Sequence, residues 1–258
     1  IPQDTSTHDK SQKELKIYQN KLKQIHQKIQ NEELAANAFK QAENFNQEAD
    51  DITNQSSSSL ESLSEAEFKI KSAIETLKDV SNNTNISQKI QNNLLIYQNK
   101  LKDIQYQIST KKLKPLVKRI SNFASSLDVS IGYNEYSKQV KQLKDEYENL
   151  TKESPAVVSH PGAKALAKAL NRYNDALIVW RYCHEGNCLN PISAGILDYR
   201  PITWLPASFA IKGKPLLKAY PVELTSNIFG QKFVQQDEVL TEIWNRAAQD
   251  IKEVRDQK

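Results

Sequence analysis

Apolar side chains recur in alternating steps of three and four residues along the first part of the chain. The clearest series runs through Leu15, Tyr18, Leu22, Ile25 and Ile29, and Ala36 and Phe39 continue its register. A stripe this narrow is typical of a coiled-coil helix rather than of the broader apolar face of a globular helix. The pattern predicts a helix over residues 10–50, which at 1.5 Å per residue is roughly 60 Å long.

Two further segments repeat this spacing. Residues 60–77 carry Leu60, Leu63, Ile70, Ile74 and Leu77, with Glu67 at the one polar position, and residues 94–108 carry Leu94, Tyr97, Leu101, Ile104 and Ile108. A weaker series follows at Tyr136, Val140, Leu143, Tyr147 and Leu150. Polar stretches at 53–59 and 81–85 separate the helices, and Pro115 is expected to end or kink the third one. We therefore expect an elongated antiparallel helical or coiled-coil region over residues 1–153.

The first and third segments are also alike residue by residue. Leu15 to Ile29 aligns without gaps with Leu94 to Ile108 at an offset of 79, and ten of the fifteen residues are identical. Heptad patterning explains the shared apolar residues, but not the shared Gln-Asn-Lys between them. The match indicates an internal repeat of 15–29 and 94–108.

The composition changes near Ser154, and residues 154–258 are predicted to form a compact helical module. Pro161 suits the first turn of a helix whose apolar face runs from Leu166 to Trp180, and a last helix is expected over residues 236–256. Frequent prolines predict an irregular segment from Asn190 to Pro206. Residues 209–212 and 216–220 form one candidate β-hairpin around Gly213. The predicted fold class is mainly α.

The charge, hydropathy and motifs of the sequence argue against several classes of function. The 258 residues carry 35 Lys and Arg against 31 Asp and Glu, which is too even a balance to indicate a nucleic-acid binder. No apolar run approaches the ~18 residues of a membrane span. P-loop, Gly-x-Ser-x-Gly and His-Glu-x-x-His motifs are absent from the sequence. These observations predict no cofactor and no enzymatic activity.

The only cluster suited to chemistry is Cys183, His184, Glu185 and Cys188. It lacks the second ligand pair of a zinc site. His160 could serve as a fourth ligand only if the tertiary fold happened to place it nearby, so no metal site is expected. A thiol nucleophile needs a positioned base, and His184 next in sequence is poorly placed to act as one. A local Cys183–Cys188 disulfide is the favoured interpretation. The Asp198-Tyr199-Arg200 run is interpreted as a structural ion pair with an anchored tyrosine.

A disulfide, a chain that starts at Ile1 and the absence of methionine favour a processed or trimmed exported protein, whether periplasmic, at the cell surface or secreted. A cluster of bases follows the third apolar series, at Lys111, Lys112, Lys114, Lys118 and Arg119. The first three of these bases are expected to complement a helix C-terminus before Pro115. An anionic partner is the alternative for this cluster.

Two interpretations of the heptad stripes remain open. The helices either close into a self-contained bundle, or they leave part of the stripe exposed for another chain or for self-association. The residues expected at such an interaction surface are Tyr18, Leu22, Ile25, Tyr97, Leu101, Ile104, Lys111, Lys112, Lys114 and Arg119. The predicted function is a non-enzymatic exported interaction or scaffold protein, such as a component of a bacterial envelope or secretion assembly. The alternative is a secreted helical toxin or effector acting at membranes through residues 204–222, and a hydrolase at Cys183–Cys188 is a third hypothesis.

Overall fold

A computed structural model describes residues 5–54, 59–80, 83–127, 131–190, 203–227 and 229–256, without the side chains of 5–9 and 255–256. The fold is mainly α, as predicted, with a few short antiparallel strands near the C-terminus. The chain divides into two compact units, residues 1–108 and 109–258. Each unit is described by itself.

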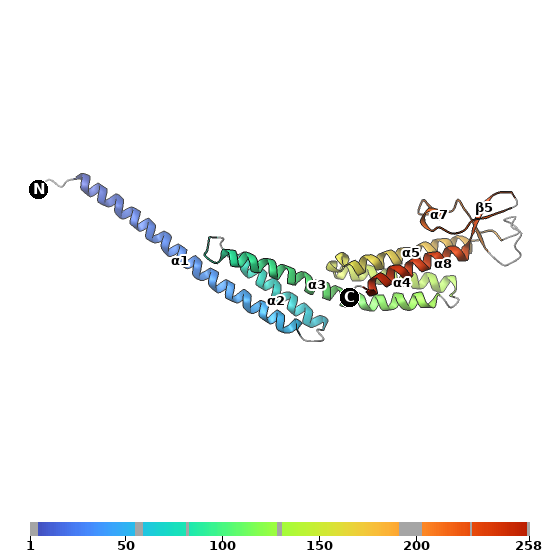
Figure 1. The fold of residues 1–258 in the computed structure, drawn as a ribbon, viewed down its shortest axis with the longest axis horizontal. Coiled ribbons are helices and arrows are strands. Elements are labelled where there is room, and N and C mark those ends of the chain that lie inside the picture. The colour runs from blue at the N-terminus through green and yellow to red at the C-terminus, as the bar shows by residue number, and fades with distance from the viewer. Residues whose placement is uncertain are drawn as a thin grey trace. The chain divides into compact units, whose positions relative to one another are not determined.

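Unit 1 contains α1 (Thr5–Thr53), α2 (Leu60–Lys78) and the first half of α3 (Ser87–Ser126). The predicted helix over 10–50 is therefore present and slightly longer. Ser59 caps α2, since its side chain accepts a hydrogen bond from the backbone N–H of Ser62 at 3.0 Å. Figure 1 shows α2 and the first half of α3 alongside the second half of α1.

The core of unit 1 combines small residues of α1 with larger side chains of α2 and α3. Ala42 and Ala49 are fully buried on α1, which allows close helix approach. The polar position predicted at Glu67 faces α3, where its carboxylate accepts a hydrogen bond from the Gln105 amide at 2.9 Å. The larger members of this core are Leu63, Ile70, Leu77, Ile90, Leu94, Tyr97 and Ile104.

The helix α3 runs on through Pro115 to Ser126, so of the two expected alternatives, an end or a kink at Pro115, the end is wrong. Proline removes one backbone hydrogen bond but leaves the rest of the ladder intact. Leu113, Leu116 and Ile120 flank Pro115 and are at most 5% exposed in the core of unit 2. Burial of these side chains outweighs the missing bond.

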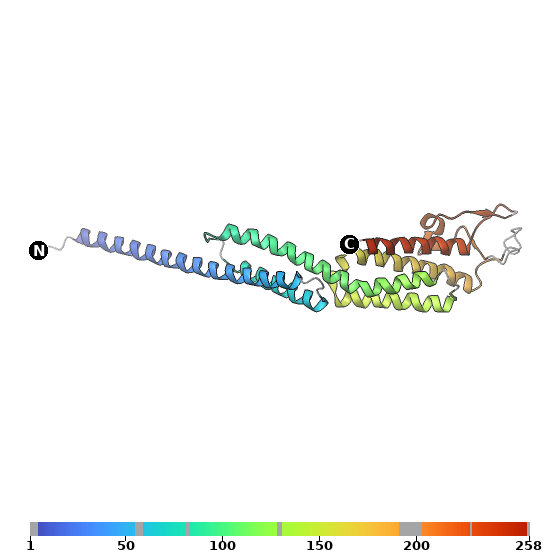
Figure 2. The ribbon, with the colours of Figure 1, turned by 60° about the horizontal axis from the view of Figure 1, so that its bottom comes forward.

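Unit 2 packs the second half of α3 with α4 (Tyr133–Glu153), η1 (Pro155–Ser159), α5 (Pro161–His184) and α8 (Gln236–Asp256). Figure 2 shows α4, α5 and α8 as roughly parallel rods beside the end of α3. The compositional change at 153/154 lies inside this unit, because α4 before it and α5 after it share one core. The predicted helices from Pro161 and over 236–256 are both present.

Short strands cover one end of unit 2. β1 (Trp204–Pro206), β5 (Lys232–Gln235) and β4 (Thr225–Ser226) form an antiparallel sheet in the order β1-β5-β4. The predicted hairpin exists as β2 (Ala210–Ile211) and β3 (Lys214–Pro215), joined by Lys212 and Gly213 with φ angles of 51° and 76°. The second arm was placed wrongly, because residues Leu216–Ala219 form the helical turn α7.

The predicted disulfide joins Cys183 in the last turn of α5 to Cys188. Gly186 turns the chain between them with φ of 82°. Of the irregular segment predicted from Asn190 to Pro206, residues 191–202 lie outside the described residues. In the described part of the chain, no helix has the length and apolarity to cross a bilayer.

Candidate protein-interaction surface

The first half of α1 exposes the apolar stripe predicted from its heptads. Here this stripe is called the α1 seam and consists of Leu15, Tyr18, Leu22, Ile25 and Ile29. Their exposed fractions lie between 50% for Ile29 and 64% for Tyr18. Contiguous exposed apolar side chains of this kind mark sites where a protein contacts another molecule.

The α1 helix becomes buried by its neighbours just after the seam. Ala35 is fully buried and Phe39 is 6% exposed, because α2 and α3 pack against α1 from this point on. The carboxylate of Glu32 accepts hydrogen bonds from the backbone N–H of Asn85 at 2.9 and 3.0 Å, just before α3 starts. Within unit 1, the seam therefore lies on the part of α1 that has no neighbouring helix (Figure 1).

The repeated segment in α3 has the opposite environment. Tyr97 and Ile104 are 3% and 2% exposed, and Leu101 is partly buried against the same core. Burial raises the pKa of Tyr97, with Glu43 and Asp50 adding to the effect. Tyr97, Leu101 and Ile104 thus contact helices of their own chain, so of the predicted apolar surface only Tyr18, Leu22 and Ile25 remain accessible.

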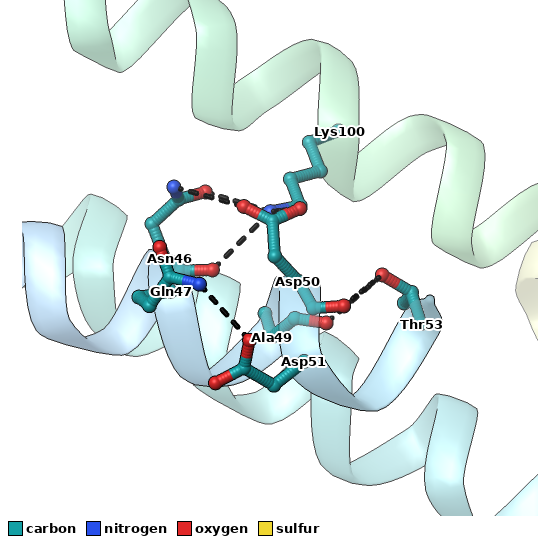
Figure 3. Close-up of polar contacts among 7 residues, drawn as sticks. All are labelled: Asn46, Gln47, Ala49, Asp50, Asp51, Thr53 and Lys100. Carbon is teal, nitrogen blue, oxygen red and sulfur yellow. Dashed lines mark hydrogen bonds and ion pairs between the residues drawn. The ribbon is translucent and has the colours of Figure 1, made fainter. Parts of the chain in front are cut away.

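A polar cluster fixes the repeated segment of α3 to α1. The ammonium group of Lys100 lies 2.5 Å from a carboxylate oxygen of Asp50 and donates to the side-chain oxygen of Asn46 at 2.8 Å (Figure 3). Figure 3 also shows Asn46 and Asp50 one turn apart on the same face of α1. Lys100 aligns with Lys21 in the exposed copy. Sequence reasoning missed Lys100 and its partners Asn46 and Asp50, because the shared Gln-Asn-Lys indicated a repeat but not a contact for the lysine.

The basic cluster is spread around α3 rather than gathered at a helix end. Lys112 donates to the hydroxyl of Ser154 at 2.6 Å, and Arg119 forms an ion pair with Glu146. Lys111 and Lys114 are exposed. Because α3 continues to Ser126, the interpretation of these bases as complementing a helix C-terminus is wrong.

The Cys-His-Glu-Gly-Asn-Cys stretch has a structural arrangement. Both cysteines are in the disulfide, and the ring of His184 stacks on Tyr133 with centroids 4.4 Å apart. His160 caps α5, since its Nδ1 accepts from the backbone N–H of Gly162 at 3.0 Å. Among the described residues, no three His, Cys, Asp or Glu side chains come together as metal ligands. Asp198, Tyr199 and Arg200 lie outside the described residues.

Unit 2 contains a cavity of about 440 Å³ between α3, α5 and α8. Its described lining includes Tyr173, Trp244 and Asn245 but no charged side chain. Burial raises the pKa of Tyr173, so its hydroxyl stays protonated at neutral pH. This lining supplies no group suited to acid–base chemistry.

Residues 204–222, considered above as a membrane-active segment, are part of the fold. Trp204, Leu205 and Leu216 are at most 1% exposed. These three apolar side chains would need to leave their buried positions before they could contact lipid.

The chain matches no protein-family model, no curated protein and no solved structure in the three comparisons. The α1 seam is therefore interpreted from its own residues and from its buried copy in α3.

Proposed function

We propose that this chain is a non-enzymatic, exported interaction protein and that the α1 seam is its binding surface for another protein. The observation that carries this proposal is the exposure of all five seam residues, half or more in each case. Completing their burial is worth about 1 kcal/mol each, or roughly 5 kcal/mol for the set, before the costs of association. A helix-in-groove or coiled-coil contact uses this kind of surface.

Helix energetics support the same proposal. Helices in proteins gain most of their stability from tertiary packing of an apolar face, and a helix without such packing is much less stable in water. The first half of α1 carries such a face without a helix of unit 1 against it. A partner would supply the missing packing.

The disulfide supports the exported location. Disulfides form and persist in oxidising compartments and are rare where thiols are kept reduced. The described residues contain no free cysteine, and both cysteines of the chain are paired. A periplasmic, surface or secreted location, including a place in an envelope or secretion assembly, fits this chemistry.

Site-specific photo-crosslinking in the cells that make the protein tests the proposed surface. A photoreactive amino acid replaces Tyr18 or Leu22 on the seam, and Asn20 or Gln27 on the opposite face of α1 as matched controls. We expect a discrete adduct from the seam positions and none from the controls. Equal adduct patterns from both faces, or none from the seam, would contradict the proposal.

A further inference from the structure

This inference rests on the function proposed above and concerns the kind of partner. We propose that the α1 seam binds an antiparallel pair of helices resembling residues 35–53 and 60–78 of this chain, with an acidic or amide side chain on the partner that receives the ammonium group of Lys21. The template is the buried copy of the same sequence in α3. Ten of fifteen residues are shared. The side chains that contact α1 and α2 in residues 94–108 therefore have mostly identical counterparts in residues 15–29, which are exposed.

The apolar half of the template is the groove that holds residues 94–108. One wall is the second half of α1, where Ala42 and Ala49 are fully buried in the core that residues 94–108 share. The other wall is α2, which contributes Leu63 and Ile70, both fully buried. Tyr97, at 3% exposed, is one of the side chains that fill this groove, and Tyr18 is its counterpart in the α1 seam. A partner for the seam needs a similar pair of apolar helix faces.

The charged half of the template lies beside that groove. Lys100 contacts Asp50 and Asn46, which sit four residues apart on α1. Lys89 lies 4.2 Å from the centre of the Phe39 ring. The alignment extends to this position, since Lys10 matches Lys89 at the same offset of 79. Lys10 and Lys21 thus repeat the spacing of Lys89 and Lys100.

Charge argues against a second copy of this chain as the occupant. In the antiparallel registers that align most seam residues, Lys21 would face a lysine of the second copy. A parallel in-register pair would bring the two Glu32 carboxylates together at the next core position. Like charges at these positions destabilise a coiled coil, whereas an acidic helix meets Lys21 with the opposite sign.

A peptide of residues 35–80 is the probe for this proposal, because it contains both walls of the groove. The labelled peptide is titrated with the full chain and with the Tyr18→Ser/Ile25→Ser variant, in which the α3 copy is untouched. We expect the full chain to bind and the variant to bind at least tenfold more weakly. Equal binding to both would show that the peptide does not use the seam and would overturn the proposal.

A charge exchange tests the role of Lys21. Lys21→Glu is expected to weaken binding by roughly tenfold, because it replaces one well-placed ion pair with a repulsion between two carboxylates. Asp50→Lys in the peptide should restore binding to the Lys21→Glu chain and weaken it to the unmodified chain. Parallel losses without restoration would overturn the assignment of Lys21.

Joining the peptide covalently to the chain tests the proposal even if the free peptide does not fold alone. The same residues 35–80 are joined to the chain through a flexible linker ahead of residue 1, which raises the effective concentration to about millimolar. Hydrogen exchange over residues 15–29 should slow at least tenfold, and unchanged exchange would overturn the proposal. If crosslinking still gives adducts from the seam, the proposed function stands and only the nature of the partner is wrong.

Discussion

Ile25 and Ile104 are the same residue in the same repeated sequence, yet their environments differ. Ile25 is 55% exposed on the α1 seam, whereas Ile104 is 2% exposed in the core of unit 1. Ile104→Ala should lower the free energy of unfolding by about 2–4 kcal/mol, because it removes buried methyl groups and leaves a cavity. Ile25→Ala should change it by less than about 0.5 kcal/mol. Denaturant titration of both variants at low protein concentration measures the difference, and equal losses would contradict the exposure of the seam.

We expect His160 to make the stability of unit 2 depend on pH. Its Nδ1 accepts the hydrogen bond from Gly162, its Nε2 lies 3.1 Å from the hydroxyl of Thr110, and burial lowers its pKa from the ordinary value of 6.5. The unfolded chain therefore takes up this proton at a higher pH than the folded chain does. Stability should be full above pH 6.5 and should fall as the pH drops below it.

The variant His160→Asn keeps a side-chain oxygen for the helix cap but removes the titrating ring. Denaturant unfolding between pH 5 and 8 should show a smaller loss on acidification for this variant than for the unmodified chain. His26→Gln, on the exposed face of α1, is the matched control. If His26→Gln flattens the profile as much as His160→Asn, the assignment to His160 fails.

Tyr136 links three helices of unit 2 through one hydroxyl group. The hydroxyl donates to the backbone carbonyl of Tyr173 at 2.9 Å and accepts from the indole N–H of Trp244 at 3.2 Å. Tyr136→Phe keeps the ring but leaves the indole N–H without this acceptor, which should cost about 1–2 kcal/mol. Calorimetry or denaturant titration tests this, with Tyr18→Phe, 64% exposed on α1, as the control that should be nearly neutral.

At the level of elements, hydrophobic spacing predicted the long helices well, since each is held by a stripe that the sequence shows directly. The α2 helix at Leu60–Lys78 and α8 at Gln236–Asp256 lie within a few residues of the predicted ranges. The sheet β1-β5-β4 was not predicted, because it pairs strands of two to four residues that are up to 31 positions apart, as in Trp204 with Gln235. Such short strands carry almost no periodic signal.

The exposed and buried copies of the repeat show a second feature that could not be predicted from the sequence. Heptad spacing identifies which side chains share a face, but both copies have the same spacing and mostly the same residues. Which copy is covered depends on where α2 folds back along α1. The core that α1 shares with α2 and α3 starts at Phe39 and excludes the α1 seam.

Pro115 tests how far tertiary packing overrides a local preference. It is exposed within α3, where it removes one backbone hydrogen bond. Pro115→Ala should restore that bond and raise the free energy of unfolding by about 1–3 kcal/mol. The neighbouring exposed Lys114→Ala should be close to neutral. A loss of stability for Pro115→Ala in denaturant titration would show that a local bend at Pro115 is needed for packing.

At the scale of the whole chain, the two compact units carry different kinds of evidence about function. Unit 1 combines a closed core with an open apolar surface, the α1 seam, on which the proposed partner would bind. The described residues of unit 2 form a large core of their own, and the cluster most suited to chemistry is locked as a disulfide. The heptad stripes of the sequence predicted an interaction surface, but only the structure separates the accessible copy of the repeat from the buried copy.

The proposed export of the chain predicts that its two cysteines are oxidised in the protein as it is made. Protein prepared without reductant should show no titratable thiol when unfolded, and two after reduction. The Cys183→Ser/Cys188→Ser variant should lose about 2 kcal/mol of unfolding free energy, the value expected when so short a loop is no longer closed in the unfolded chain. The bond closes only a short turn at the end of α5, so α1, α2 and the rest of unit 1 should keep their hydrogen-exchange protection in this variant. Free thiols in the untreated protein would remove the main support for export, whereas the α1 seam, which contains no cysteine, would keep its argument unchanged.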